Sequence, residues 1–304
     1  MSQQSAVERK ALFLGGFAYL AMGIFGWYTF YLSNSEAMLL DGNYNIVNAL
    51  ASFAGYYIIS IRSKRTSTFP WGQFVYESLY ALVKGLLILG ILTAALLENS
   101  LKIFRYFYHG ETHQVNTSPI IPLVVFSTTV CFLLSRYYSR SNSKIGNISS
   151  MLSADTKAAK IDGYLSLFGG GSLVAMLFVG RLFAGLEFLQ YIGDALVVII
   201  LELAMIKEPL HIIRENFLEL AGGKLEQDLE WGHIYNSVRS VSASSFKIDD
   251  IFVTKTGSMF LVLVYISQNG SIIDVGEIGD FREKCLQNLT NNYFHCTLEI
   301  VLND

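Results

Sequence analysis

Long apolar runs, separated by short charged connections, constrain this sequence more than any other feature. From Ala11 to Lys207 the charged residues gather in small clusters between these runs, whereas after Glu208 a charge occurs every few positions. A helix needs about 20 apolar residues to cross the hydrocarbon core of a bilayer. The pattern therefore predicts a membrane domain at residues 1–207 and a soluble domain at residues 208–304.

The composition supports this division and excludes several classes of protein. Hydrophobic residues make up 52% of the chain and charged residues only 15%, whereas about a quarter of the residues in a typical soluble domain are charged. The net charge of −3 gives no information about nucleic acid, and no basic stripe indicates binding to it, so no nucleic-acid partner is predicted. Cys131, Cys285 and Cys296 form no CxxC pair, so they indicate buried thiols rather than disulfides or a thiolate metal cluster.

Nothing in the sequence is typical of an enzyme. No nucleophile–base pair or nucleotide-binding loop is present, and the three glycines at positions 169–171 lie inside an apolar run rather than after a strand. These glycines favour close helix packing, with a hinge as the alternative. No catalytic residue and no cofactor is therefore predicted.

Six stretches are long and apolar enough to be predicted as membrane helices: residues 11–32, 37–61, 74–98, 119–138, 153–179 and 188–206. The first stretch is too long for a signal peptide, and further spans follow it. The start of the fifth is the most polar, because two aspartates and two lysines lie there.

The orientation follows from the Lys and Arg residues in the short connections, which are enriched on the cytoplasmic side of membrane proteins. Connections on one side carry Arg9, Lys10, Arg62, Lys64, Arg65, Arg136, Arg140 and Lys144. Those on the other side carry Lys102, Arg105 and Arg181. Both termini are therefore predicted to be cytoplasmic, in agreement with an even number of spans.

Beyond residue 208 the pattern changes to that of a small α+β domain. Helices are predicted at residues 225–241 and 274–291, and strands at 246–254, 259–267 and 294–302. The segment Lys255-Thr256-Gly257-Ser258 predicts the turn between the first two strands. This α-β-β-α-β order with antiparallel pairing is typical of a ferredoxin-like layer. The predicted fold class is thus a six-helix membrane bundle followed by a cytoplasmic ferredoxin-like domain.

Ionisable residues inside the predicted membrane helices indicate a possible ion pathway, since each costs about 2.5–3.5 kcal/mol at the bilayer centre. Asp41 and Asn45 are four positions apart on the second span, and Asp155 and Asp162 are seven apart on the fifth. Each spacing places both residues on one helix face. Two helices with oxygen ligands directed inward can build a cation site between them.

Other roles for these residues stay open. Asp41 lies near a helix start, where it can act as a cap, and Asn45 can serve as an interhelical hydrogen-bonding residue. Asp155 lies near the cytoplasmic end of its span and can pair with a neighbouring lysine. Lys84, an isolated cation in the third span, either pairs with a carboxylate of the site or extends to the interface.

Five segments, in this order, resemble motifs of the cation diffusion facilitators, a family of homodimeric divalent-metal exporters driven by proton exchange. They are residues 40–45 (Leu-Asp-Gly-Asn-Tyr-Asn), 69–77 (Phe-Pro-Trp-Gly-Gln-Phe-Val-Tyr-Glu), 154–166, Asp194-Ala195 and Arg214-Glu215. The resemblance spans nearly the whole chain and implies a transport site formed by two residues of helix 2 and two of helix 5.

Carried over residue by residue, the resemblance places the helix 2 ligands on Asp41 and Asn45, the latter where a carboxylate is more common. On helix 5 the first ligand falls on Ala158, which cannot bind a metal, and the second on Asp162. Asp155 is a further candidate ligand that could fill the gap.

This donor set, made of carboxylate and amide oxygens, favours harder cations such as Mn²⁺, Fe²⁺ or Mg²⁺ relative to Zn²⁺. Without a histidine in the site, proton coupling falls on Asp162 or Asp41. Isolated His233 and His295 do not indicate a metal sensor in the soluble domain.

The leading hypothesis is a divalent-cation exporter of the bacterial inner (plasma) membrane that exchanges the cation for protons and dimerises through its C-terminal domain. One alternative is a monovalent or organic cation/proton antiporter with a modified site, and another is a non-transporting membrane scaffold.

Overall fold

The computed structural model describes residues 3–33, 35–110, 118–172, 175, 188–224, 229–241, 245–268, 274–290, 293 and 295–302. The chain forms two compact units, each built from several segments. Unit 1 comprises Met1–Ile61, Tyr80–Asn147 and Met151–Arg214, and unit 2 comprises Arg62–Leu79, Ile148–Ser150 and Glu215–Asp304. The domain boundary between residues 207 and 208 stays a prediction, since units defined by packing need not coincide with membrane and soluble segments.

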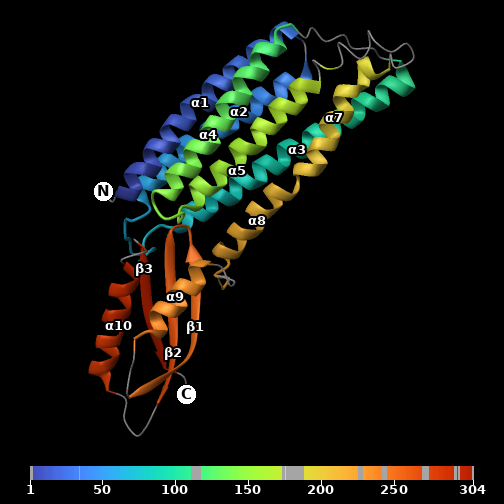
Figure 1. Cartoon of the computed structure of the whole chain (residues 1–304). Coiled ribbons are helices and arrows are strands. Elements are labelled where there is room, and N and C mark those ends of the chain that lie inside the picture. Colours follow the sequence, from blue (N-terminus) through green and yellow to red (C-terminus); the bar gives the residue numbers. More distant parts are fainter. Residues whose placement is uncertain are drawn as a thin grey trace. The chain divides into compact units, whose positions relative to one another are not determined.

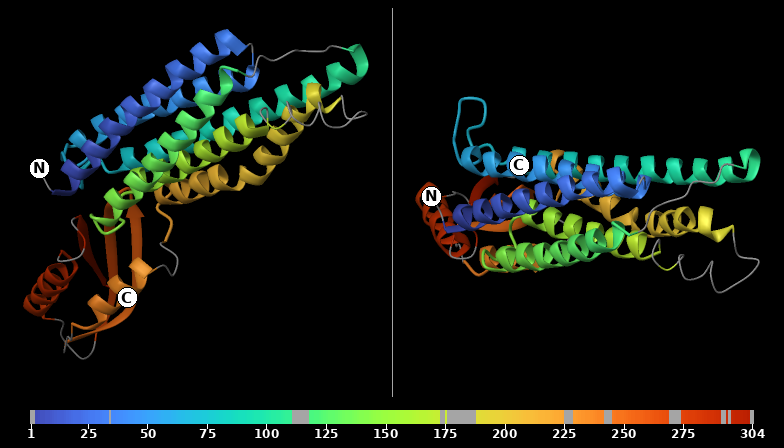
Figure 2. Two further views of the ribbon diagram at one scale, coloured as in Figure 1. Left: turned by 45° about the horizontal axis from the view of Figure 1, so that its top comes forward. Right: turned by 90° about the horizontal axis from the view of Figure 1, so that it is seen from above.

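Unit 1 is helical. Its elements are α1 (Gln3–Ser33), α2 (Glu36–Ile61), α3 (Val75–His109), α4 (Ile120–Ser143), α5 (Ser150–Leu165), the π-helical turn η1 (Ser166–Gly170) and α7 (Leu189–Met205). Helix α8 (Lys207–Leu220), which the sequence patterns did not predict, runs across the limit between the units. Helices α1 to α5 run alongside one another in all views (Figures 1 and 2).

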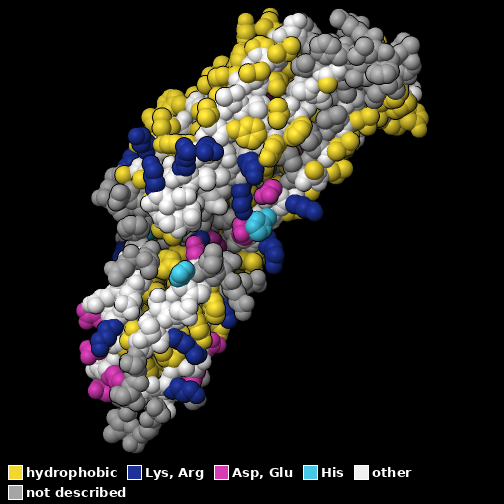
Figure 3. All heavy atoms as spheres, in the orientation of Figure 1, with side chains coloured by type: hydrophobic (Ala, Val, Ile, Leu, Met, Phe, Trp, Pro, Cys, Tyr) yellow, Lys and Arg dark blue, Asp and Glu magenta, His cyan; other side chains and the backbone are white. Residues whose placement is uncertain are grey.

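Among the described residues, three helices are long and apolar enough to cross a membrane: Ser5–Ser33, Val75–His109 and Ile120–Ser143. The other three predicted stretches are helical wherever they are described, but residues 173, 174 and 176–179 of the fifth lie outside the described residues. On the face drawn in Figure 3, hydrophobic side chains cover much of unit 1, and Lys and Arg side chains gather at one of its ends. The six-span count stays a prediction.

Glycines allow α1 and α2 to pack closely, and this contact fixes the helix that carries Asp41. A Cβ atom added to Gly26 would lie 2.8 Å from the Cα atom of Gly42, and one added to Gly42 would lie 2.6 Å from Cδ1 of Trp27. Small residues at helix interfaces let backbones approach in this way, and the resulting van der Waals contact stabilises membrane helix pairs.

Unit 2 contains a three-stranded sheet and two helices in the predicted α-β-β-α-β order. The elements are α9 (Leu229–Arg239), β1 (Phe246–Thr256), β2 (Met259–Gln268), α10 (Val275–Thr290) and β3 (Cys296–Leu302). Residues 225–228, 291 and 294, where predicted elements began or ended, lie outside the described residues. Helix α9 packs on β1 and α10 on β3, and the two helices also contact each other, so both cover the same face of the sheet.

The prediction of antiparallel pairing is correct for only one pair of strands. Strands β1 and β2 are antiparallel, whereas β2 and β3 are parallel, and the strand order is β1-β2-β3. The physical reason is the intervening helix, because a crossover through α10 returns the chain in the same direction as β2. The sheet is therefore mixed.

The turn between β1 and β2 consists of two residues, Gly257 and Ser258, and lies within the predicted turn segment 255–258, whose first two residues belong to β1. Gly257 has a φ angle of +60° and occupies the first central position. A type II′ turn requires this conformation, which glycine adopts without steric cost, and its twist matches that of the flanking strands.

Candidate cation site

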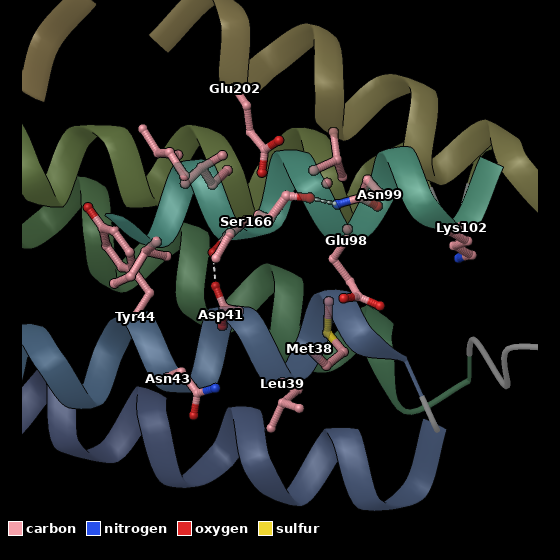
Figure 4. Close-up of a pocket in the computed structure, with 18 of the residues that line it drawn as sticks. Met38, Leu39, Asp41, Asn43, Tyr44, Glu98, Asn99, Lys102, Ser166 and Glu202 are labelled. Atoms are coloured by element: carbon pink, nitrogen blue, oxygen red, sulfur yellow. Dashed lines mark hydrogen bonds between the residues drawn. The ribbon is translucent and has the colours of Figure 1, made fainter. Parts of the chain in front are cut away.

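A cavity of about 380 Å³ lies between the helices of unit 1, and two of the predicted ligands line it. Asp41 of α2 and Asp162 of α5 both contribute to its wall. The hydroxyl group of Ser166, at the start of η1, donates a 2.8 Å hydrogen bond to the Asp41 carboxylate (Figure 4). The structure therefore brings a carboxylate from each of the two predicted helices to one cavity.

Asn45 lies one helical turn from Asp41 but does not belong to the cavity wall. Its side-chain amide donates to the backbone carbonyl of Asp41 at 2.8 Å and to the Asp41 carboxylate at 3.4 Å. The amide oxygen, the atom that could bind a cation, is buried without a hydrogen-bond partner. In this arrangement Asn45 orients Asp41 and keeps its own oxygen available.

Asp162 is 1% exposed and accepts a 2.9 Å hydrogen bond from the thiol of Cys131 on α4. Cys131 is thus a buried thiol, as predicted, and it also contacts the site. Ala158, one turn before Asp162, is buried in an apolar cluster with Tyr44, Ile88 and Leu92. The position where the family has its other helix 5 ligand is therefore enclosed by apolar side chains, apart from the Tyr44 hydroxyl.

Asp155 lies in a different environment from the other three predicted residues. Its carboxylate forms an ion pair with Lys84 of α3 and accepts a 3.1 Å hydrogen bond from the Tyr80 hydroxyl. Both charged groups are buried, and neither lines the cavity. Lys84 thus pairs with one of the candidate carboxylates, but with the one that does not line the cavity. Asp155 neutralises this buried lysine in the present arrangement.

The described residues contain no group of three or more His, Cys, Asp or Glu side chains arranged to hold a metal ion. Asp41 and Asp162 share the cavity without forming a closed three-ligand centre.

Two buried polar side chains in the wall of this cavity were not predicted from the sequence. Glu202 of α7 is 3% exposed, and Ser127 of α4 is fully buried. In the described part of the chain, both carboxylate oxygens of Glu202 lack a hydrogen-bond partner, and so does the hydroxyl group of Ser127. The signal for Glu202 was present, because it is an isolated carboxylate in the apolar run from Ala195 to Ile206.

The backbone of the fifth helix changes at the level of the cavity. The π-helical turn η1 follows α5 directly, and its residues Ser166, Gly169 and Gly170 line the cavity. Such turns often occur at functional sites, because the extra residue redirects side chains. A Cβ atom added to Gly170 would overlap Val124 of α4, whereas Gly169 and Gly171 face open space. Close packing therefore explains only one glycine of the run.

The motif at residues 69–77 lies in unit 2, and none of its residues lines the cavity. Glu77 forms a buried ion pair with Arg62, and its other oxygen accepts a 2.6 Å hydrogen bond from the backbone amide of Ser258. Gly72 adopts a φ angle of +104°, which accounts for glycine at this motif position. The motif therefore holds the β1–β2 turn.

A second carboxylate completes this contact. Glu219 of α8 accepts hydrogen bonds from the Ser78 hydroxyl at 2.6 Å and from the Gly257 amide at 3.0 Å. Burial raises the pKa of Glu219, while the charge of Lys255 and these two hydrogen bonds lower it. We call the group Arg62, Glu77, Ser78, Glu219, Gly257 and Ser258 the loop–hairpin cluster.

A comparison with protein families identifies the chain. The model of the cation efflux transmembrane domain matches residues 12–221, a range that includes the cavity. None of the curated proteins compared with the chain matches it. Because the family match covers well over half of the chain and contains Asp41, Asp162 and the helices that carry them, the chain belongs to the cation efflux family of integral membrane cation transporters.

Proposed function

We propose that this protein exports a divalent cation from the cytoplasm in exchange for protons. One observation carries the proposal: Asp41 of α2 and Asp162 of α5 line the same cavity within unit 1. Asn45 holds Asp41 in place and has a free amide oxygen. These oxygens make up a small anionic site inside an apolar helical unit, where an unpaired cation would otherwise be unstable.

The chemistry of the donors favours a hard cation. Carboxylate, amide and hydroxyl oxygens suit Mn²⁺, Fe²⁺ or Mg²⁺, whereas Zn²⁺ is commonly held by imidazole or thiolate in closed sites. Ala158 and its apolar neighbours offer no nitrogen ligand. Since one water takes up about 30 Å³, the cavity of about 380 Å³ has room for a partly hydrated cation.

Coupling to protons follows from the same carboxylates. A carboxylate buried in an apolar unit is stable when it is protonated or when it binds a cation, but not as a bare anion. Protons and cations therefore compete for Asp41 and Asp162. Rocking of α2 and α5 against the other helices would expose the site to each side in turn. Asp155 contributes indirectly in this proposal, by balancing the charge of Lys84.

Transport into proteoliposomes tests the proposal. Vesicles containing a fluorescent reporter for Mn²⁺ and an imposed pH gradient should show influx with the wild type and at least a tenfold lower rate with Asp162→Ala. The exposed Asp280 in unit 2 offers a matched control, and Asp280→Ala should retain the wild-type rate. Equal rates for the wild type and Asp162→Ala would refute the site assignment, and a rate independent of the pH gradient would refute proton exchange.

We also propose that both termini face the cytoplasm of a bacterial inner membrane and that two protomers pair through unit 2. The Lys and Arg residues in the connections support the orientation. Cross-linking of cysteine variants in intact membranes would give dimers through unit 2 if the pairing holds. Labelling of a terminal cysteine from the outer side of intact cells would contradict the orientation.

A monovalent or organic cation is a second candidate cargo. The lack of a three-ligand group among the described residues favours it, because such cations are held by fewer and weaker ligands. Sodium-dependent proton movement in metal-free vesicles would support this reading, whereas proton movement that requires Mn²⁺ would exclude it.

A further inference from the structure

Glu202 is a buried carboxylate in the cavity wall for which the cation site already described has no role. It projects from α7, a helix that supplies neither Asp41 nor Asp162, yet it lines the same cavity. In the view of Figure 4 it points toward the part of the cavity where Ser166 and Asp41 lie. A role in packing alone would be better served by leucine or methionine, which have no charge to desolvate.

The environment of Glu202 requires a ligand. The side chain is 3% exposed, and both of its oxygens lack partners in the described residues. Lys102 and Arg105 line the same cavity, but no ion pair joins either of them to Glu202 within the described part of the chain. A buried carboxylate without a donor or a counter-ion costs several kcal/mol. Within the described part of the chain no side chain satisfies it, and a proton or a cation in the cavity would remove this cost.

A second independent group points to the same space. Ser127 of α4 is fully buried, lines the cavity and has a hydroxyl group without a hydrogen-bond partner in the described residues. Buried hydroxyl groups nearly always have a partner in native structures, either protein or bound solvent. Two unsatisfied oxygen-bearing side chains from two helices thus face a cavity that also contains the transport carboxylates.

We propose that Glu202 binds the transported cation at a second station in the cavity, separate from the Asp41–Asp162 station, with Ser127 as an additional oxygen donor. The proposal rests on the proposed function and deepens it. The ligand class is a hard divalent cation that retains some of its waters, such as Mn²⁺ or Mg²⁺, because the station offers only oxygen atoms. A cation moving between the two stations stays neutralised along the cavity, which compensates for the missing ligand at Ala158.

Two measurements on the full-length protein test the proposal: Mn²⁺ influx into proteoliposomes and Mn²⁺ binding by titration calorimetry in detergent. Glu202→Gln keeps the shape of the side chain and removes its charge. It should lower influx at least tenfold and weaken Mn²⁺ binding at least tenfold, whereas Glu202→Asp should recover part of both. The exposed Glu208 of α8 lies outside the cavity, and Glu208→Gln should behave as the wild type.

The outcomes separate this inference from the proposed function. If the wild type transports Mn²⁺ and Glu202→Gln matches it in influx and in binding, the Glu202 station is refuted while the exporter stands. If the wild type transports no divalent cation, the proposed exporter function is refuted, but calorimetry still tests Mn²⁺ binding at Glu202. Weaker Mn²⁺ binding by Glu202→Gln than by the wild type supports the Glu202 station. Equal binding by the two proteins, or no binding by the wild type, overturns it. If Glu202→Gln does not fold, Ser127→Ala takes its place in both measurements. Ser127→Ala should lower Mn²⁺ influx about threefold, and wild-type influx and binding by this variant would refute the Glu202 station.

Discussion

The two units each contain a buried polar cluster, and the clusters differ in how their carboxylates are satisfied. In the loop–hairpin cluster of unit 2, Glu77 has Arg62 and a backbone amide, and Glu219 has a hydroxyl and a backbone amide. In the cavity of unit 1, Asp41 accepts from Ser166 and, at 3.4 Å, from Asn45. Asp162 has Cys131 as its one side-chain donor, and Glu202 has no donor in the described residues.

This difference distinguishes a cluster that stabilises the fold from a site that is proposed to bind a transported ion. A buried ion pair whose oxygens are all satisfied holds the backbone in one geometry, and the loss of one partner is costly. A carboxylate with free oxygens stabilises nothing by itself and is retained where a mobile ion or proton supplies the missing partner. The loop–hairpin cluster is therefore structural, and the cavity is the proposed site for a transported cation. Four variants test this comparison, from the largest expected effect to the smallest.

Removal of one partner from the loop–hairpin cluster should have the largest effect on stability. Arg62→Ala leaves Glu77 buried without its counter-ion, which should lower the free energy of unfolding by about 3–5 kcal/mol. The double variant Arg62→Leu/Glu77→Leu should recover much of this loss, because no charge is then buried alone. Thermal unfolding of the detergent-solubilised protein measures both.

An exposed ion pair in unit 2 provides the control for that experiment. Arg282 and Glu299 are 45% and 39% exposed and lie 3.3 Å apart, so Glu299→Ala should cost less than about 1 kcal/mol. Similar losses for Arg62→Ala and Glu299→Ala would contradict the structural role of the buried pair.

The turn in the same cluster should show the next largest effect. A Cβ atom added to Gly257 would lie 2.7 Å from the carbonyl oxygen of Phe74 and 2.5 Å from a carboxylate oxygen of Glu77. Gly257→Ala should therefore cost more than the ~1–2 kcal/mol of the left-handed backbone alone. Gly222 has a φ angle of +72° and faces open space, so Gly222→Ala measures that backbone cost. Equal shifts in melting temperature would show that the turn is not tightly held.

His295 should give a smaller effect that depends on pH. Its ring lies against Phe74, with 4.7 Å between the ring centroids. Burial lowers the pKa of His295 from 6.5, and the charge of Arg62 lowers it further, while Glu77 raises it. The unfolded chain then binds the proton more readily, so stability should fall as pH drops below about 6.5 toward the lower folded value.

The variant His295→Phe should reduce the difference in melting temperature between pH 7.5 and pH 5.5. Replacement of the exposed His233 by phenylalanine should leave the wild-type difference in place. If both variants keep that difference, other groups cause the acid sensitivity of the protein.

The smallest effect on stability is expected in the cavity. Glu202→Gln removes a charge that has no described partner, so its melting temperature should equal or exceed that of the wild type. Glu77→Gln, the same change in the loop–hairpin cluster, should lower the melting temperature by several degrees because the buried ion pair between Arg62 and Glu77 is lost. If Glu202→Gln lowers the melting temperature as much as Glu77→Gln does, then Glu202 has a structural partner. The contrast between the two clusters would then be wrong.

Much of the fold could be predicted because it is encoded locally. Apolar runs of the right length predicted the helices, and alternation with a Gly-Ser turn predicted the β1–β2 hairpin. The direction of β3 was missed, because pairing in a sheet depends on the connection and not on the strand's own sequence. Helix α8 was missed because it is amphipathic and continues from the last apolar run.

The sequence by itself identified Asp41, Asn45 and Asp162 as candidate ligands. Polar side chains at helical spacing in apolar runs are costly to bury in a membrane and therefore usually have a function. Only the tertiary structure paired Asp155 with Lys84, enclosed Ala158 in apolar side chains and placed Glu202 in the cavity wall. The physical reason is that a helix face is set by near neighbours in the sequence, whereas the partner of a buried polar group is set by the packing of helices that are far apart along the chain.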